Sequence, residues 1–81
     1  MEDQVLYRFN RNQNDSVYIS FREYKGRKYL DLRIFYQPED QEQMRATKKG
    51  ITIPLELFGE LKKGIASCEK KLSTANSHWV V

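Results

Sequence analysis

The sequence predicts an α+β domain in which a curved, antiparallel, four-stranded sheet precedes one C-terminal amphipathic helix. Apolar and polar residues alternate in four segments between residues 5 and 53, which is the period of half-buried strands. After Pro54 the apolar residues recur every three or four positions, which is the period of a helix. The 81 residues suffice for one domain, with a predicted core at about residues 5–72 and a flexible tail at 73–81.

The first two strands are predicted at residues 5–11 and 16–24, joined by the polar turn at 12–15. In the second strand Val17, Ile19 and Phe21 share one face, which we expect to form the core. The alternate positions, from Tyr18 to Tyr24, are expected to point outward.

A tight hairpin is predicted at residues 25–27, because Gly26 can adopt the positive φ that such turns require. The third strand, at residues 28–36, places Leu30, Leu32 and Ile34 toward the core. Its outward positions carry polar and aromatic residues, so the paired strands are expected to present Tyr, Arg and Phe side chains together. The polar segment 37–43 is predicted to be an exposed loop.

The fourth strand is predicted at residues 45–53, where Gly50 indicates a bulge or a close backbone approach and Pro54 ends the ladder. A helix follows from Leu55. Its apolar stripe consists of Phe58, Leu61, Ile65, Cys68 and Leu72. The stripe suits either the sheet or a second helix from a partner subunit, and a core this small favours a dimer.

The composition excludes several classes of protein. With 40% hydrophobic and 31% charged residues, the chain has the composition of a soluble globular domain. Its apolar runs are a few residues long, whereas a membrane-spanning helix needs about 20. The acidic start at residues 1–4 is unlike a signal peptide, so we expect an intracellular protein without a membrane partner.

Catalytic and metal chemistry are not expected either. Cys68 and His78 are the single cysteine and histidine, too few for a disulfide or a structural zinc site. The two are ten residues apart, and His78 falls in the predicted tail, so they do not suggest a nucleophile–base pair. The acidic residues of the 37–43 loop lack the spacing of a calcium loop. We therefore expect no enzyme activity, metal or cofactor.

The charge distribution is more informative than the net charge of +3. Between residues 22 and 33 there are five cations and two anions, and Arg45, Lys48 and Lys49 add three cations farther along. Tyr24 is interleaved with the first group. Cations that neutralise phosphates and rings on which bases stack are the features of single-stranded nucleic-acid binding. A solvated, self-stacking sheet face explains the same pattern equally well.

Five segments together are more specific. They are an alternating strand with an aromatic-Lys-Gly turn at residues 17–27, a strand carrying Asp-x-Arg at 29–33, Met-Arg at 44–45, a Lys-Gly-Ile strand at 48–53, and the pair Phe58 and Leu61. In this order they resemble the C-terminal domain of the positive cofactor four family of transcriptional coactivators, over roughly residues 16–70.

The resemblance implies a homodimer that binds single-stranded or melted DNA with little sequence preference and that meets transcription or replication proteins. By position, the implied nucleic-acid-binding residues are Arg22, Tyr24, Lys25, Arg27, Arg33, Tyr36, Arg45, Lys48 and Lys49. The basic and aromatic run at residues 22–28 adds Lys28. The implied dimer interface comprises Phe58, Leu61, Ile65 and Cys68. Among these residues, Tyr36 has the parity of the core-facing positions.

The chain departs from the family pattern at one edge of the DNA-binding groove that the resemblance implies. Asp15 and Val17 stand where better-known members carry basic residues, so Arg8 or Arg11 would have to substitute. Two other functions stay open. One is a protein-interaction module that docks a factor through the helix stripe or the tail containing Trp79. The other is single-stranded RNA binding through the same groove.

Overall fold

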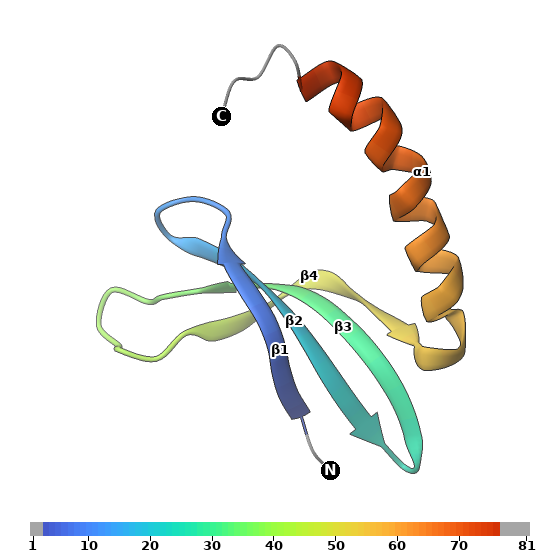
Figure 1. Ribbon diagram of the computed structural model, residues 1–81. Coiled ribbons are helices and arrows are strands. Elements are labelled where there is room, and N and C mark those ends of the chain that lie inside the picture. The colour runs from blue at the N-terminus through green and yellow to red at the C-terminus, as the bar shows by residue number, and fades with distance from the viewer. Residues whose placement is uncertain (1–2, 77–81) are drawn as a thin grey trace.

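A computed structural model describes residues 3–76, and His78 and Trp79 lie outside this range. The four strands are β1 (Asp3–Asn10), β2 (Asp15–Tyr24), β3 (Arg27–Tyr36) and β4 (Arg45–Pro54). They form one curved antiparallel sheet whose strand order is the chain order (Figure 1). A 3-10 turn, η1 (Leu55–Leu57), leads into α1 (Phe58–Asn76). The predicted fold class is confirmed. No helix within residues 3–76 is long and apolar enough to span a membrane.

The β2–β3 hairpin is the regular centre of the sheet. Its register is unbroken from Tyr24, opposite Arg27, to Asp15, opposite Tyr36. Both residues of the connecting turn have positive φ, 52° at Lys25 and 78° at Gly26. This is the geometry whose twist matches that of paired strands. The turn predicted from Gly26 is confirmed, and its first position displays Lys25 at the tip of the hairpin.

The buried side chains lie on the face that was expected to point outward. The buried residues of the described chain are Ser16, Tyr18, Ser20 and Asp31. The Tyr18 ring stacks on Phe35, with centroids 4.0 Å apart, and accepts a 3.2 Å hydrogen bond at its hydroxyl from Arg8. Long side chains on this face therefore cover one another, and the prediction that Tyr18 and Phe35 point to solvent is wrong.

The apolar face of the sheet is only partly covered. Val17, Ile19 and Phe21 are half-buried, and Ile51 is 56% exposed. Figure 1 shows α1 leaving the sheet at η1 and extending away from it, so the helix does not cover the apolar face. Of the two places considered for the helix stripe, packing on the chain's own sheet is not observed.

Four of the five stripe residues on α1 are exposed. Phe58, Ile65 and Leu72 are 43%, 59% and 49% exposed, Cys68 is exposed and Leu61 is half-buried.

The helix also continues four residues beyond its predicted end at Leu72, to Asn76. The hydroxyl of Thr74 donates a 3.2 Å hydrogen bond to the Lys70 carbonyl one turn earlier. This back-bond lets a residue that favours helix ends remain inside the helix.

Candidate nucleic-acid interface

The tip of the β2–β3 hairpin gathers four of the predicted binding residues: Tyr24, Lys25, Arg27 and Lys28. All four are exposed, and the Tyr24 side chain keeps 53% of its surface in solvent. The Lys25 ammonium lies 5.3 Å from the centre of the Tyr24 ring, within cation–π range. An accessible ring and an unburied cation therefore stand side by side at a fixed turn.

A hollow of about 220 Å³ opens next to this ring. It is lined by Arg22, Glu23, Tyr24, Tyr29 and Thr52. Arg22 lies directly opposite Tyr29 in the β2–β3 register, so both side chains emerge on the same face of the sheet. The hollow is large enough for a nucleobase, and two of its lining residues are tyrosines. Tyr29 and Thr52 were not among the binding residues predicted from the sequence, although Tyr29 shares the parity of Asp31 and Arg33.

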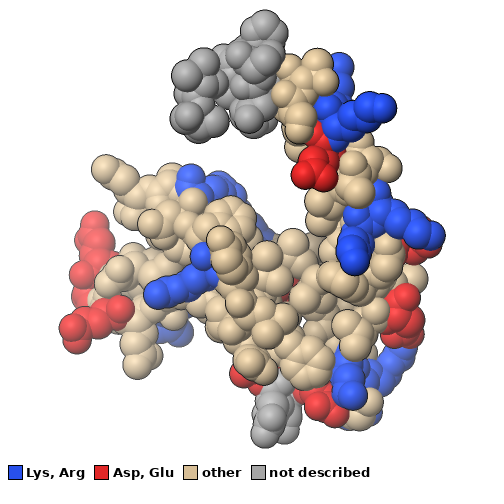
Figure 2. Space-filling view, viewed as in Figure 1, with Lys and Arg blue, Asp and Glu red and all other residues tan. Residues whose placement is uncertain are grey.

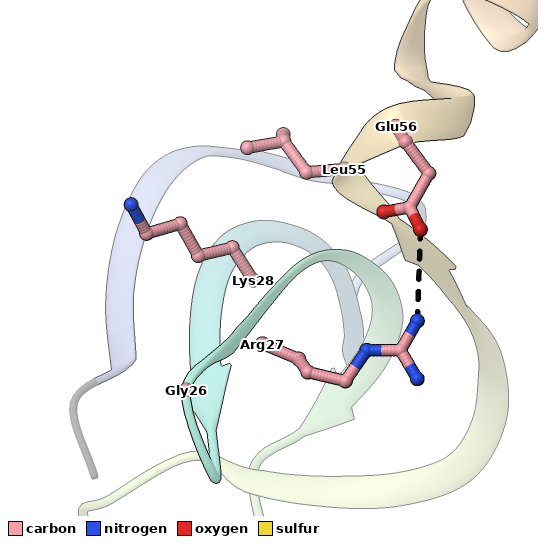
Figure 3. Close-up of a pocket in the computed structure, with 5 residues that line it drawn as sticks. All are labelled: Gly26, Arg27, Lys28, Leu55 and Glu56. Carbon is pink, nitrogen blue, oxygen red and sulfur yellow. Dashed lines mark ion pairs between the residues drawn. The ribbon is translucent and has the colours of Figure 1, made fainter.

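A wider hollow of about 510 Å³ lies where the hairpin tip meets the start of the helix (Figure 3). On one side the guanidinium of Arg27 lies 3.5 Å from the Glu56 carboxylate, and both side chains are about two-thirds exposed. Figure 3 shows Lys28 pointing away from that ion pair. An exposed pair of this kind contributes little to stability, so Arg27 can exchange Glu56 for another anion at small cost.

Arg33, in contrast, is engaged inside the sheet. Its Nε and Nη2 donate to the two carboxylate oxygens of Asp31 at 3.0 and 2.9 Å, and its Nη1 donates to the Thr47 carbonyl at 3.1 Å. The Thr52 hydroxyl donates to the same carboxylate at 2.7 Å. The Arg33 side chain is only 18% exposed. The structure thus places Arg33 where it joins β3 to β4, away from the exposed cations.

The hydrogen bonds and charges around Asp31 and Arg33 favour the charged forms of both side chains. Burial raises the pKa of Asp31, but the hydrogen bonds from Arg33 and Thr52 and the charges of Arg33 and Arg22 outweigh it. The net pKa of Asp31 therefore lies below its ordinary value. The hydrogen bond to Asp31 likewise raises the pKa of Arg33.

Gly50 allows Arg33 to occupy this position. It lies directly opposite Arg33 in the β3–β4 register. A Cβ atom at Gly50 would lie 2.7 Å from the Leu32 carbonyl oxygen and 2.9 Å from Cζ of Arg33. The close backbone approach predicted at Gly50 is confirmed.

Beyond Gly50 the pairing shifts, so that Phe35 lies opposite Ala46. Within the resulting bulge, the Thr47 hydroxyl donates to the Ile34 carbonyl at 2.7 Å and accepts from the Lys49 amide at 3.1 Å. Lys48 and Lys49 stand exposed on this bulge. The bulge predicted near Gly50 is therefore present and displays two of the predicted cations.

Replacing Gly50 with alanine is expected to lower the free energy of unfolding by about 1 to 3 kcal/mol, because the added methyl group overlaps backbone atoms that cannot move aside. Urea denaturation of purified protein measures the change. Gly59→Ala is the matched control, since an added Cβ there meets nothing within 4 Å. Equal stability of wild type and Gly50→Ala would contradict the steric argument.

The remaining predicted residues lie at the far end of the hairpin. Tyr36, which is 40% exposed, lies opposite Arg45, and Tyr36 and Lys49 help to line a hollow of about 370 Å³. Nine residue steps along β3 separate the pair at Arg27 from the pair at Tyr36, about 30 Å at strand geometry. Tyr36 and Tyr24 also occupy opposite faces of the sheet. The structure therefore forms two groups, a hairpin-tip group and a far-end group, rather than one patch.

Both arginines considered as substitutes at the groove edge have a partner within the chain. Arg8 donates to the Tyr18 hydroxyl, and Arg11 forms a 3.8 Å ion pair with Asp15.

Comparisons with known proteins agree with this architecture. The sequence profile of the family described as Transcriptional Coactivator p15 (PC4) matches residues 11–64. Two crystal forms of a PC4 homologue from Burkholderia pseudomallei superpose with TM-scores of 0.75 and 0.74 at 25% identity. These alignments cover 84% of this chain and 90% and 98% of that protein.

A more distant structure shares the fold. The bacteriophage T5 homologue of the eukaryotic transcription coactivator PC4, implicated in recombination-dependent DNA replication, has a TM-score of 0.58 at 18% identity. This alignment covers 98% of this chain and 85% of that one. No curated protein sequence matches the chain significantly. With most of the sheet and the first part of α1 inside the profile match, the chain belongs to the PC4 family.

Proposed function

We propose that this protein is a homodimer that binds single-stranded DNA with little sequence preference. The observation that carries the proposal is the hairpin-tip group, where the exposed Tyr24 ring and Lys25 stand beside a base-sized hollow. A ring offers a stacking surface to any base, and the cations neutralise the phosphates between bases. The same chemistry does not read a particular sequence, because it contacts no hydrogen-bonding pattern unique to one base.

The far-end group extends the binding surface. Tyr36 and Arg45 offer a second ring and an exposed cation about 30 Å from the tip, and the exposed Lys48 and Lys49 lie nearer to it, beside Gly50. Because Tyr24 and Tyr36 lie on opposite faces of the sheet, a strand that meets both groups has to pass from one face to the other around the sheet. Arg33 lies between them but is held by Asp31, so in this proposal it positions β4 and its bulge and leaves phosphate contact to the exposed cations.

In this proposal a second copy of the chain covers the apolar sheet face and the helix stripe. Tyr18 is the only buried large apolar side chain among residues 3–74, which is too little core for a stable domain of this size. The half-covered sheet face and the exposed stripe of Phe58, Leu61, Ile65 and Cys68 together form a surface of the kind that marks an interface. In a homodimer each helix stripe is buried by the other subunit.

The family suggests the biological setting. Its description is that of a transcriptional coactivator, and the phage homologue is implicated in recombination-dependent replication. We therefore place the proposed role inside the cell, in transcription, replication or repair, with proteins of those processes as partners. The proposed activity is binding without a catalytic step.

Tyr24→Ala is expected to weaken binding of a 20-nucleotide oligo-dT about 5- to 150-fold, the loss of roughly 1 to 3 kcal/mol of base stacking. Fluorescence anisotropy measures the affinity. Tyr24→Phe keeps the ring and should retain most of the binding. An unchanged affinity for Tyr24→Ala would remove the ring from the proposed site. An RNA of the same length, run in parallel, shows whether the site distinguishes the two sugars.

Lys25→Ala is the companion variant in the same titrations. It should lower the slope of log affinity against log salt by about 0.7, because one phosphate contact is lost. Wild-type protein that binds no oligo-dT at low salt would refute the proposed function.

A further inference from the structure

The wider hollow at the hairpin tip contains an acidic residue among its cations. Of the five residues that line it, Arg27 and Lys28 are basic and Glu56 is acidic. Glu56 belongs to η1, beyond the end of β4, and its carboxylate lies 3.5 Å from Nη2 of Arg27. Figure 3 shows the two charged groups facing each other. A carboxylate from a different element therefore occupies the anion-binding end of Arg27.

Arg27 is also the cation directly beside the stacking ring. It lies opposite Tyr24 in the β2–β3 register. Residues directly opposite each other project from the same face of the sheet, with Cβ atoms about 4.5 to 5.5 Å apart. Consecutive bases of a strand are joined through phosphates, so a base stacked on Tyr24 brings a phosphate close to Arg27. The phosphate and the Glu56 carboxylate would thus approach the same guanidinium.

The pair of Arg27 and Glu56 is open to exchange. The two side chains are 65% and 68% exposed, so water and salt screen their attraction. Figure 2 shows basic and acidic side chains at the molecular surface around the start of α1. Carboxylate and phosphate oxygens both accept hydrogen bonds from guanidinium N–H groups. Because the two anions repel each other, one has to leave when the other binds.

We propose that Glu56 is an internal competitor of the DNA backbone. Its carboxylate holds Arg27 in the free protein, and a phosphate of the bound strand displaces it. This role rests on the proposed single-strand function and adds a residue that lowers the affinity of the same site. A free phosphate has to displace Glu56 unaided, whereas a phosphate attached to a base stacked on Tyr24 is present at a high effective concentration. Glu56 therefore favours strands that stack over anions that do not.

Glu56→Gln tests the competition, because it removes the charge and keeps the size of the side chain. The variant should bind a 20-nucleotide oligo-dT about 5-fold more tightly than wild type in anisotropy titrations at low salt, the upper range for an exposed ion pair. The gain should shrink as salt is raised, because salt screens the pair that the wild type has to break.

Glu60→Gln is the matched control. Glu60 lies in the first turn of α1 and pairs with Lys63 at 3.7 Å, so the variant removes the same charge from an exposed pair close by in the chain. It should change the affinity by less than about 2-fold. Circular dichroism and sedimentation check that helix content and oligomeric state match the wild type in every variant.

Arg27→Gln, alone and combined with Glu56→Gln, completes a double-mutant cycle. Because Glu56 acts through Arg27, replacing Glu56 should give no gain in affinity when Arg27 is absent. The same gain in both backgrounds, or a wild-type affinity for Glu56→Gln, overturns the competition and leaves the single-strand function standing. Wild-type protein that binds no oligo-dT at low salt refutes both proposals.

Discussion

Asp31→Ala is expected to lower the free energy of unfolding by about 3 kcal/mol. The substitution leaves the Arg33 guanidinium without the carboxylate that accepts two of its hydrogen bonds, at 2.9 and 3.0 Å, in a site where Arg33 is only 18% exposed. Breaking a buried ion pair by removing one partner costs about 3 to 5 kcal/mol, and the residual exposure of Arg33 favours the lower end. The loss also frees the Thr52 hydroxyl, which donates to the same carboxylate.

Urea denaturation at neutral pH measures this loss, with Asp40→Ala as the control. Asp40 lies in the exposed 37–44 loop, where removing a carboxylate should change stability by less than about 0.5 kcal/mol. Similar midpoints for the two variants would show that the Asp31–Arg33 pair is not a structural link.

The dependence of stability on pH provides a second test of the Asp31 carboxylate. The pKa of Asp31 is lower in the folded protein than in the unfolded chain, so its ionised form favours folding. That contribution is complete above the unfolded pKa, near 4, and is lost as pH falls through the lower folded pKa. The difference in stability between wild type and Asp31→Ala should therefore be constant near neutral pH and shrink below about pH 4.

Ile65→Glu is expected to dissociate the proposed dimer. Ile65 is 59% exposed in the single chain and lies in the middle of the helix stripe. A carboxylate buried there without a partner costs several kcal/mol, and a symmetric interface contains two of them. The dimer dissociation constant should rise by at least about 100-fold. Sedimentation velocity over a range of protein concentrations would show a shift from dimer to monomer.

Ser67→Glu is the matched control for that experiment. It introduces the same charge on the same helix, but on the side away from the stripe, where Lys63 and Lys71 lie one turn away. It should leave the dimer intact. A wild-type protein that sediments as a monomer, or an Ile65→Glu variant that remains a dimer, would contradict the assignment of the stripe to a subunit interface.

Local sequence signals predicted the elements of this fold well. The alternation in residues 16–24 and 28–36 identified the central hairpin, and Gly26 located its turn to within a residue. Such signals depend on neighbours in the chain. The end of α1 was less predictable, because Ser73 and Thr74 are residues that favour helix termini. The structure shows that the Thr74 hydroxyl donates to the Lys70 carbonyl and that the helix continues.

The faces of the sheet were harder to predict, because burial depends on what lies across the sheet. Alternation correctly separated Val17 and Ile19 from Tyr18 and Ser20, but the chain provides no layer over its apolar side. The Tyr18 ring is instead buried against Phe35. In the candidate site, Arg33 looked like the other cations in the sequence. Its partner Asp31 is two residues away on the same face, but the sequence does not show that the Arg33 guanidinium donates hydrogen bonds to that carboxylate.

The order of the strands has a consequence for how the chain folds. Each strand pairs with the strand next to it in sequence, through connections of four, two and eight residues. The entropy of closing such loops differs by only about 1 kcal/mol between the shortest and longest, with the β2–β3 turn the least costly. We therefore expect folding to nucleate at the Lys25–Gly26 turn and to spread outward to β1 and β4. Because synthesis proceeds from the N-terminus, the meander can assemble strand by strand while α1 is still within the ribosome.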